Sequence, residues 1–549
     1  MESRNVRTRI AVFFAAALVL LISQLVWAGE NNSIVQGVVK DSSGKPVAGA
    51  FVKLKNDSRR LEFMVISQAQ GRYTAADLPA GQYTVQGVGN GFQSAWSAPI
   101  DAAPGKPAKL DVSLTTKQGA MLAHAWPFKD PEASLASLPK ELPEGDGKKL
   151  VAARCTACHG ADQFMPYHMD RDLWEHTVAG MRANMRAANV RDLTDDEAKL
   201  VVDYLAANFK PSGPADANDR LPRTLLEGKA LKYRAVQYSL TDLYAEPHDV
   251  AVDPKGNGWV SERAGRIGHL DPNTLEFSET PIPPGPARPD SQRLGNPQID
   301  AKGMMWIPDG PNGRWLSYDT SSGEFTIYQW PKGAHGGAGG NTVALHPNGT
   351  VWQTGANGAR MLNPATKEWK FFETPSSLAA GDPTGAYGMA VAGDGKVWFA
   401  ENLANRMAKI DPVTGKVEEL KIPFDGNAYP RRMNTDAHGN LWVGLWNGGR
   451  LMKIDYETDH MTLYVPPTPT PGTYSVSVDK KNNLIWVSEQ QADKIARFNP
   501  ATGEWVEFPL PDSQSDPRRI EVDQHNPNRV WWTGNLASRM GYIEVLGAN

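Results

Sequence analysis

The stretch Val397-Trp398-Phe399-Ala400-Glu401, preceded by Gly395 and Lys396, belongs to a unit that recurs along the second half of the chain. Its tryptophan is one of a series with successive spacings of 47, 46, 46, 44, 44 and 45 residues. Self-similarity at such a period predicts supersecondary units that stack on one another. The tryptophans of the series are Trp259, Trp306, Trp352, Trp398, Trp442, Trp486 and Trp531.

Each repeat has the same internal order. A short strand such as residues 249–253 precedes a turn with Gly, the Trp strand, a third strand such as residues 266–270, and an outer strand that ends in Pro. This order predicts a four-stranded blade, and seven blades close a β-propeller, here over residues 231–549. The last repeat ends near Leu546 without an outer strand, so we expect residues 233–238 to complete that blade and remove its exposed edge.

The repeats also carry a family resemblance. Gly256-Asn257-Gly258-Trp259-Val260-Ser261-Glu262, and residues 395–401 followed by 405–412, make about 300 residues similar to the virginiamycin B lyase (streptogramin lyase) propellers. The resemblance implies a Glu-x-His and a further Glu that hold magnesium, here Glu246, His248 and Glu262, with His248 and Glu262 as catalytic residues. The family's second His, its base, is replaced here by Arg518 and Arg519.

A polar set is predicted around one end of the central channel, where loops enter the inner strands and leave the Trp strands. Carboxylates with an imidazole suit Mg²⁺ or Ca²⁺, whereas paired arginines suit a carboxylate or phosphate. The recurrence of Glu at positions 262, 401 and 489 also fits loop capping in a solvated funnel. The predicted substrate-binding residues are Arg431, Arg432, Tyr474, Arg518 and Arg519, and the wider set adds Arg263, Gln298, Asp309, Asn341, Tyr387, Glu401, Asn402, Trp446, Glu489 and Asn535.

Residues 33–115 alternate apolar and polar side chains between turn signals, which predicts a small β-sandwich. The runs Pro46-Val47-Ala48-Gly49-Ala50 and Leu78-Pro79-Ala80-Gly81-Gln82-Tyr83 resemble the carboxypeptidase regulatory-like family. The resemblance implies a fold and no chemistry, so a spacer or docking role is expected.

The only two cysteines lie in Cys155-Thr156-Ala157-Cys158-His159, the C-x-x-C-H spacing that attaches a c-type haem. Both thiols would bond the porphyrin and His159 would ligate the iron. The alternatives are a redox C-x-x-C and half of a zinc site.

A helix over residues 148–158 is expected to present this motif within a small α-helical cytochrome c domain, residues 145–210. A second helix is expected after the capping box Thr194-Asp195-Asp196-Glu197. Residues 174–181 resemble the haem domains of quinohaemoprotein dehydrogenases, which implies Met181 as the distal ligand. Met165, Met169, Met185 and His176 are the alternatives.

The amino terminus indicates export. Arg4, Arg7 and Arg9 precede an apolar run, and Val26-Trp27-Ala28 suits cleavage, so residues 1–28 are predicted to be a signal peptide and the protein periplasmic or otherwise exported. A retained anchor is the alternative, and no further membrane span is expected. The net charge of −4 and the lack of a basic stripe argue against nucleic acid as a partner.

The chain is therefore expected to be mainly β and multidomain, with linkers at residues 116–144 and 211–230. The leading hypothesis is an exported c-type cytochrome that exchanges electrons with a redox partner protein or a small-molecule donor, with the propeller as its binding platform. The alternative is a metal-dependent, lyase-like enzyme with the haem as an accessory. An oxidoreductase that joins both parts lies between these hypotheses.

Overall fold

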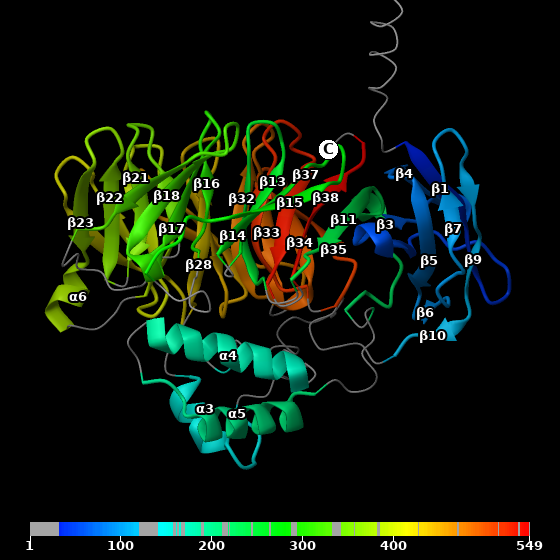
Figure 1. Ribbon diagram of the computed structural model, residues 1–549, viewed down its shortest axis with the longest axis horizontal. Helices are drawn as coiled ribbons and strands as arrows, with labels where there is room; N and C mark the ends of the chain where they lie inside the picture. Colours follow the sequence, from blue (N-terminus) through cyan, green and yellow to red (C-terminus); the bar gives the residue numbers. More distant parts are fainter. Residues whose placement is uncertain are drawn as a thin grey trace, which may run out of the picture.

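The structure is a computed structural model, and the residues that it describes are 32–119, 141–156, 161, 164–165, 171–187, 191–210, 218, 220–242, 245–262, 265–286, 294–331, 342–355, 357–380, 385–426, 428–468, 471–513, 515–535 and 538–547. The described chain is mainly β. It contains a ring of blades, a sandwich beside the ring and a small helical unit below it (Figure 1).

Seven four-stranded antiparallel blades form the predicted propeller. The first three are β12(Pro247–Val252), β13(Gly258–Glu262), β14(Arg266–Leu270), β15(Phe277–Pro281); β16(Gln298–Ile299), β17(Met304–Asp309), β18(Arg314–Asp319), β19(Phe325–Gln329); and β20(Val343–Leu345), β21(Val351–Gly355), β22(Gly358–Asn363), β23(Glu368–Glu373).

The next three are β24(Ala386–Val391), β25(Val397–Glu401), β26(Arg406–Ile410), β27(Val417–Lys421); β28(Pro430–Thr435), β29(Leu441–Leu445), β30(Arg450–Ile454), β31(Met461–Tyr464); and β32(Thr473–Asp479), β33(Leu484–Glu489), β34(Lys494–Asn499), β35(Glu504–Pro509). The last blade consists of β36(Pro517–Val522), β37(Arg529–Gly534), β38(Arg539–Val545) and β11(Tyr233–Ser239).

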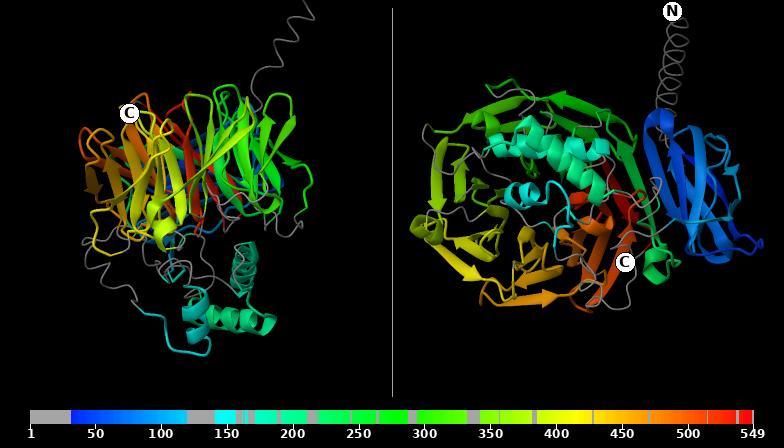
Figure 2. Two further views of the ribbon diagram at one scale, coloured as in Figure 1. Left: turned by 90° about the vertical axis from the view of Figure 1, so that its left-hand side faces the viewer. Right: turned by 90° about the horizontal axis from the view of Figure 1, so that it is seen from below.

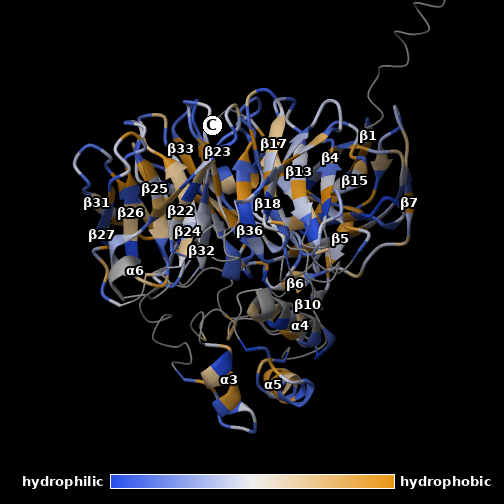
Figure 3. Ribbon diagram, turned by 60° about the vertical axis from the view of Figure 1, so that its left-hand side comes forward, coloured by the Kyte–Doolittle hydropathy of each residue, from blue (hydrophilic) through white to orange (hydrophobic). Residues whose placement is uncertain are grey.

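The repeated tryptophans are buried between adjacent blades, which explains their period. Trp531 of the last blade, for example, packs in one cluster with Val250 and Val260 of the first. Gly258 makes room for it, because a Cβ there would come within 2.4 Å of the indole ring. Figure 3 shows apolar residues along the strands and hydrophilic residues in the loops.

The ring closes as the sequence predicts. β11 runs antiparallel to β38, with Tyr233 opposite Val545 and Ser239 opposite Arg539. The other edge of β11 is not exposed, however: it pairs with β3(Leu61–Ile66) of the amino-terminal module. The last blade and one sheet of that module therefore form a single ten-stranded sheet.

The amino-terminal module has the predicted sandwich architecture. Its sheets are β4-β1-β8 with β9 beside β1, and β10-β6-β5-β2-β3 with β7 beside β5. The strands are β1(Ser33–Asp41), β2(Phe51–Asn56), β3, β4(Arg72–Leu78), β5(Gly81–Gly89), β6(Phe92–Gln93), β7(Ile100–Ala102), β8(Ala108–Lys109), β9(Val112–Leu114) and β10(Thr116–Lys117).

A buried charge cluster joins this module to the propeller. The Lys53 ammonium lies 2.7 Å from Asp512 and 3.3 Å from Glu62, and its side chain has no exposed area. Burial acts to lower the pKa of Lys53, but the two carboxylates raise it overall. Removal of one partner from a buried ion pair strongly destabilises the folded state, because the remaining charge is left without compensation. The cluster therefore holds the two modules in one relative position.

The helical unit contains α3(Lys148–Arg154), α4(Arg171–Ala187) and α5(Asp195–Asn208). Its core includes Val151, Trp174, Val178 and Val201, and the predicted Thr194–Glu197 capping box is present. The first helix ends at Arg154, four residues before the predicted end, and the Thr156 hydroxyl donates to the Ala152 carbonyl at that end. A hydroxyl bonded to the backbone in this way competes with helix continuation.

The helical unit lies against one particular face of the propeller. The helix α6(Pro375–Ala380), in the connection from the outer strand β23 to the inner strand β24, marks this face. Seen from below, α3 and α4 lie across the ring of blades (Figure 2). In the described part of the chain, no helix is both long and apolar enough to span a membrane.

Candidate functional site

Five of the seven inner strands contain a β-bulge at the end nearest the helical unit. In β28, for example, Pro430 pairs with Leu445 and Met433 with Val443, so Arg431 and Arg432 together face the single residue Gly444. Bulges re-aim side chains at the cost of local pairing. The bulged positions are His248, Tyr387-Gly388, Arg431-Arg432, Tyr474-Ser475 and Arg518-Arg519.

A residue with left-handed backbone geometry precedes each bulged strand. Glu246, a predicted metal ligand, takes this position in the first blade with φ of 44°. Its counterparts have quite different side chains, so the position is defined by the backbone turn into the channel. They are Gly385, Tyr429, Gly472 and Asp516.

We call His248, Tyr387, Arg431, Tyr474 and Arg518 the channel mouth. These five residues come from five blades and were all in the predicted polar set. Each belongs to a bulge, and all five are linked by hydrogen bonds or ring contacts. Tyr474 contacts Tyr387, Arg431 and His248, Arg431 contacts Tyr387, and Arg518 contacts His248.

Asp249 is the carboxylate next to the channel mouth. Its Oδ2 lies 2.8 Å from His248 Nδ1 and its Oδ1 lies 2.6 Å from an Arg432 terminal nitrogen. Burial acts to raise the pKa of Asp249, but Arg432 and His248 hold it well below the usual range. Arg432 also donates to the Thr342 hydroxyl at 3.2 Å, so this fifth-blade side chain is bonded both to the first blade and to the residue that precedes the third.

These contacts define the tautomer of His248. An Arg518 terminal nitrogen lies 3.3 Å from His248 Nε2. Because guanidinium only donates, Nε2 accepts, and Nδ1 carries the proton that Asp249 accepts. His248 is thus an imidazole oriented by Asp249 on one side and Arg518 on the other.

Aromatic rings surround Arg431. Its guanidinium carbon lies 4.4 Å from the ring centre of Tyr429, 4.7 Å from Tyr387, 4.9 Å from Tyr474 and 5.9 Å from Trp446. The hydroxyls of Tyr387 and Tyr474 are hydrogen-bonded to each other. Burial acts to raise the pKa of Tyr387, but the charges of Arg431 and Arg432 lower it overall. Burial raises the pKa of Tyr474. Because the two hydroxyls are bonded to each other, the loss of a proton belongs to the pair and not to either tyrosine alone.

The second arginine of each pair faces into the channel. Arg432 and Arg519 line a cavity of about 370 Å³ between the inner strands, together with Gln298, Thr342 and Ser475. Arg519 donates to Glu521, and the Gln298 amide, with its oxygen toward Arg519, accepts from the same guanidinium.

The predicted carboxylates at the ends of the Trp strands have a different place. Glu262 lies 2.9 Å from Arg266, Asp309 lies 2.7 Å from Arg314, and Glu401 lies 3.1 Å from Arg406. Each acid thus bonds the base at the start of the next strand outward from the channel. We call these the edge ion pairs. We include Lys494 with Glu507 at 3.4 Å, in which the base again lies opposite the Trp-strand acid, Glu489, but the paired acid comes from the outer strand β35.

Their carboxylates have unusual acidity. Burial, followed by the charge of Glu279, raises the pKa of Glu262 to about 7, and burial with Glu419 raises that of Glu401 to about 7. Burial and Glu507 raise the pKa of Glu489 well above its ordinary value. Glu262 and Glu401 are each bonded to an arginine of their own blade.

The structure does not gather the predicted metal ligands. Glu262 is bonded to Arg266, while His248 is bonded to Asp249. Among all the residues described, no group of three or more His, Cys, Asp and Glu side chains could hold a metal ion. The expected Glu246–His248–Glu262 grouping is therefore not seen, because the strand end directs Glu262 outward along its blade.

Of the predicted haem residues, Cys155 and Met181 are described. Cys155 is half-buried at the end of α3, and burial raises the pKa of its thiol to about 11. It packs against the helical core together with Phe164, Met165 and Met185. Met181 is half-buried on α4. Cys158, His159, Met169 and the side chain of His176 lie outside the described residues, as do Arg263 and Asn341 of the channel set.

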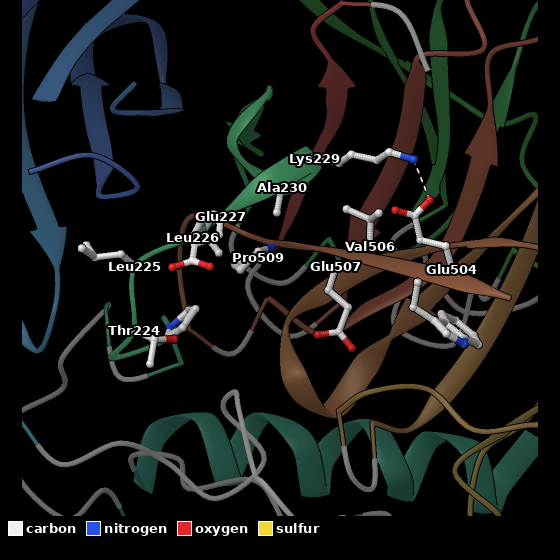
Figure 4. A pocket seen from close by; sticks show the side chains of 12 residues that line it. Thr224, Leu225, Leu226, Glu227, Lys229, Ala230, Glu504, Val506, Glu507 and Pro509 are labelled. Carbon is white, nitrogen blue, oxygen red and sulfur yellow. Dashed lines mark hydrogen bonds and ion pairs between the residues drawn. The ribbon is translucent and has the colours of Figure 1, made fainter. Parts of the chain in front are cut away.

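A second cavity, about 460 Å³, lies between β35 and residues 222–230, which lead into β11 of the last blade (Figure 4). Lys229 and Glu504 form an ion pair of 2.6 Å at its rim. Leu226, from the same segment, donates its backbone N–H to Gly49 of the sandwich. The cavity thus lies where the sixth blade, the segment before β11 and the sandwich meet. None of the predicted site residues lines it.

Known proteins resemble the chain module by module. The Virginiamycin B lyase family model matches residues 298–548, and the Carboxypeptidase regulatory-like domain model matches residues 34–115. Among curated proteins, no sequence matches this chain.

Solved structures match the propeller. A streptogramin B lyase has a TM-score of 0.51 and 21% identity, covering 58% of this chain and 100% of its own. Virginiamycin B lyase from Staphylococcus aureus, with selenomethionine, has a TM-score of 0.50 and 19% identity, covering 57% and 100%. A catalytically inactive variant of that lyase with quinupristin gives the same values. At such identity the likeness shows the fold alone: this chain carries a virginiamycin B lyase-like propeller and a carboxypeptidase regulatory-like amino-terminal domain.

Proposed function

We propose that this protein is an exported c-type cytochrome that transfers electrons, with its propeller as the binding platform for a ligand or redox partner. The observation that carries the proposal is the Cys155-Thr156-Ala157-Cys158-His159 motif at the end of α3. Such spacing suits two covalent bonds to one porphyrin and an axial histidine.

The packing of the helical unit fits this cofactor. Trp174, Val151 and Val178 are buried in its core, whereas Cys155, Met165 and Met185 remain half-buried on the same cluster. A core that leaves its cysteine and two thioethers half-buried leaves apolar surface for a flat, apolar group. When bound, haem supplies reversible one-electron chemistry at its iron.

Cys155 and Cys158 would hold the group, and His159 would be its proximal ligand. The family resemblance implies Met181 as the distal ligand. Met181 lies on α4, and Met185 lies one turn further along the same helix. Met185 packs against the same core as Cys155, which supports it as the alternative. Either thioether would favour the reduced iron.

The helical unit faces the bulged ends of the inner strands (Figure 2). A donor bound there would lie beside the cytochrome unit, which supports the propeller as the platform. Export, by way of the segment 1–28, belongs to the same proposal, because covalent haem attachment and secretion of the chain go together.

The first experiment concerns covalent attachment. The Cys155→Ala/Cys158→Ala variant should lose haem staining on a denaturing gel, because both thioether bonds are gone. Thr156→Ala is the matched control inside the motif and should stain like the wild type. An unstained wild-type band from a host with a working cytochrome c maturation system would refute the proposal.

The second experiment identifies the distal ligand. Met181→Ala should lower the reduction potential and change the ferric spectrum, with Met185→Ala as the paired variant. If only Met185→Ala changes the spectrum, Met185 is the ligand.

A lyase-like activity is the second candidate, supported by the fold and by the oriented His248–Asp249 pair. In the structure, however, Glu262 is bonded to Arg266, and Arg518 lies beside His248 Nε2. We therefore expect that the purified protein does not linearise quinupristin in the presence of magnesium. Mass spectrometry of the incubated quinupristin measures this. Observed linearisation would reverse the ranking of the two functions.

A further inference from the structure

Two arginines reach across the channel from different blades. Arg432, in the fifth blade, is bonded to Asp249 in the first blade and to Thr342 before the third. Arg519, in the last blade, is bonded to Gln298 in the second. Both arginine side chains are buried. Together they form a polar layer across the channel, directly behind the channel mouth.

The channel cavity, about 370 Å³ in volume, has a buried end and an exposed end. Arg432 and Arg519 line its buried end. Beyond the last residues of the inner strands, its lining includes the exposed side chains of Pro347, Lys480 and Gln524. The inner strands begin at the face that carries the helical unit, so the cavity opens on the opposite face of the propeller (Figure 1).

The wall between the two ends consists of strand edges. Residues 343–345, 389–391 and 432–435 line the cavity in unbroken runs and belong to β20, β24 and β28. Each of these strands is the terminal strand of its blade. The edge of a terminal strand presents backbone N–H and C=O groups. The wall therefore suits a ligand with hydroxyl groups, which donate and accept hydrogen bonds.

The charge of the cavity is positive. Arg432, Arg519 and Lys480 line it, and Glu521 is its lining carboxylate. Asp249, outside the lining, lies 2.6 Å from Arg432. Three cations thus face two carboxylates, which leaves a positive charge for a ligand to neutralise. Guanidinium groups bind carboxylate and phosphate oxygens with two parallel hydrogen bonds.

Glu521 indicates the kind of group that the buried end accepts. It follows Arg519 by two residues on β36 and accepts a hydrogen bond from its guanidinium. Its side chain is partly exposed. The chain thus places one carboxylate of its own against this arginine. An oxyanion that enters the cavity would compete with Glu521 for the same donors.

We infer that the channel cavity binds a small organic oxyanion, a carboxylate or a phosphate ester, held by Arg432 and Arg519. The ligand enters from the face away from the helical unit. The volume of the cavity lies within the range of roughly 300–1,000 Å³ that is typical of small-molecule sites. The inference rests on the proposed role of the propeller as a ligand platform, and it gives that ligand a chemical class and an entrance.

The test is titration calorimetry of the full-length mature protein with probes that share a three-carbon skeleton. Glycerate carries a carboxylate, glycerol 3-phosphate carries a phosphate ester, and glycerol is uncharged. We expect heat of binding with at least one of the charged probes, and none with glycerol at the same concentrations. The charged probe that binds more tightly distinguishes a carboxylate site from a phosphate site.

Arg519→Gln should weaken binding of the tighter probe at least about tenfold, because a charge-assisted hydrogen bond is lost. Arg406→Gln is the matched control and should leave the affinity unchanged. Arg406 is bound to Glu401 and Glu419 in its own blade and is not among the residues that line the cavity. Circular dichroism and thermal melting check that each variant is folded.

Glu521→Gln should have the opposite effect. It removes the carboxylate that competes for Arg519, so the same probe should bind roughly three- to tenfold more tightly. This variant keeps both arginines of the site. It decides the matter if Arg519→Gln does not fold, and unchanged or weaker binding would then overturn the inference.

Three further outcomes would overturn the inference: no heat with either charged probe, glycerol binding as tight as that of the charged probes, or equal affinity in the wild type and folded Arg519→Gln. The Cys155→Ala/Cys158→Ala variant separates this inference from the cytochrome proposal. If it binds the tighter probe like the wild type, the site stands whatever the haem experiments give.

Discussion

The edge ion pairs and the channel mouth are both polar, both buried in large part and both at the strand ends on one face of the propeller. The edge ion pairs repeat: acid at the end of the Trp strand, base at the start of the next. The channel mouth varies among the five bulged blades: one has a histidine, His248, two have tyrosines, Tyr387 and Tyr474, and two have arginines, Arg431 and Arg518. What recurs in a repeat protein serves the blade, and what varies at equivalent positions is free to serve a ligand.

The largest effect should come from breaking an edge ion pair. Lys494 is fully buried beside Glu507 and Glu489, so Lys494→Met leaves carboxylates without their cation. We expect the free energy of unfolding in urea to fall by about 3–5 kcal/mol, as for other buried pairs that lose one partner. Lys416→Met, whose ammonium is 70% exposed beside Glu418, should cost less than about 1 kcal/mol. Equal losses in the two variants would contradict the structural role of Lys494.

Asp249 joins the channel mouth to the channel cavity, because it contacts both His248 and Arg432. Asp249→Asn keeps a hydrogen-bonding group between His248 and Arg432 but removes the charge, which should cost about 2–3 kcal/mol at pH 7. Because the pKa of Asp249 is lowered in the folded state, its contribution is present above its unfolded pKa of about 3.9 and is lost as pH falls further. Urea unfolding at pH 7 and at about pH 2.5, below that unfolded pKa, measures this, and a difference between wild type and variant that does not shrink at the lower pH would contradict it.

The edge carboxylates should give the opposite pH dependence. With a pKa near 7, folded Glu262 retains a proton that the unfolded chain has released above about pH 4.5, so stability falls as pH rises between these values. Glu262→Gln mimics the protonated form. It should match the wild type near pH 4.5 and exceed it by about 1–2 kcal/mol at pH 8. Thermal melts across this range, with Glu457→Gln as the exposed control, measure it, and a pH-independent difference would contradict it.

The smallest effect on stability should come from the channel mouth itself. Arg518 is partly exposed, and its buried partner Asp516 keeps a hydrogen bond from Gln490, so Arg518→Gln should lower the unfolding free energy by about 1 kcal/mol. Arg406→Gln removes a cation from both Glu401 and Glu419 and should cost an equal or larger amount. Urea unfolding of the two variants measures the difference, and a clearly larger loss in Arg518→Gln would contradict the distinction.

Much of the propeller could be predicted from the sequence. The Trp period gave the number of blades, and the missing outer strand after Leu546 predicted closure by residues 233–238, which the pairing of β11 with β38 confirms. These predictions succeed because each repeat encodes its own blade through local alternation and turns.

Other features were missed because they depend on contacts between distant segments. The pairing of β3 with β11 joins residues 61–66 to residues 233–239, and alternation cannot name the partner of a strand edge. The family resemblance groups Glu262 with His248 as metal ligands, and it does not indicate the contact that Glu262 makes within its own blade. Only the structure assigns it to Arg266. The end of α3 at Arg154 has a local cause instead, because the Thr156 hydroxyl bonds back to the Ala152 carbonyl, which the motif spacing does not reveal.

By itself, the sequence determined the blades, the sandwich alternation, the capping box of α5 and the single C-x-x-C-H motif, because each is written in residues close along the chain. The tertiary structure decided which polar residues meet. Bulges in five inner strands bring His248, Tyr387, Arg431, Tyr474 and Arg518 together, and pairing along the blade turns Glu262 away from them. The physical reason is that a bulge depends on the register against the neighbouring strand, and the channel-mouth contacts join residues of different blades, so local alternation predicts neither.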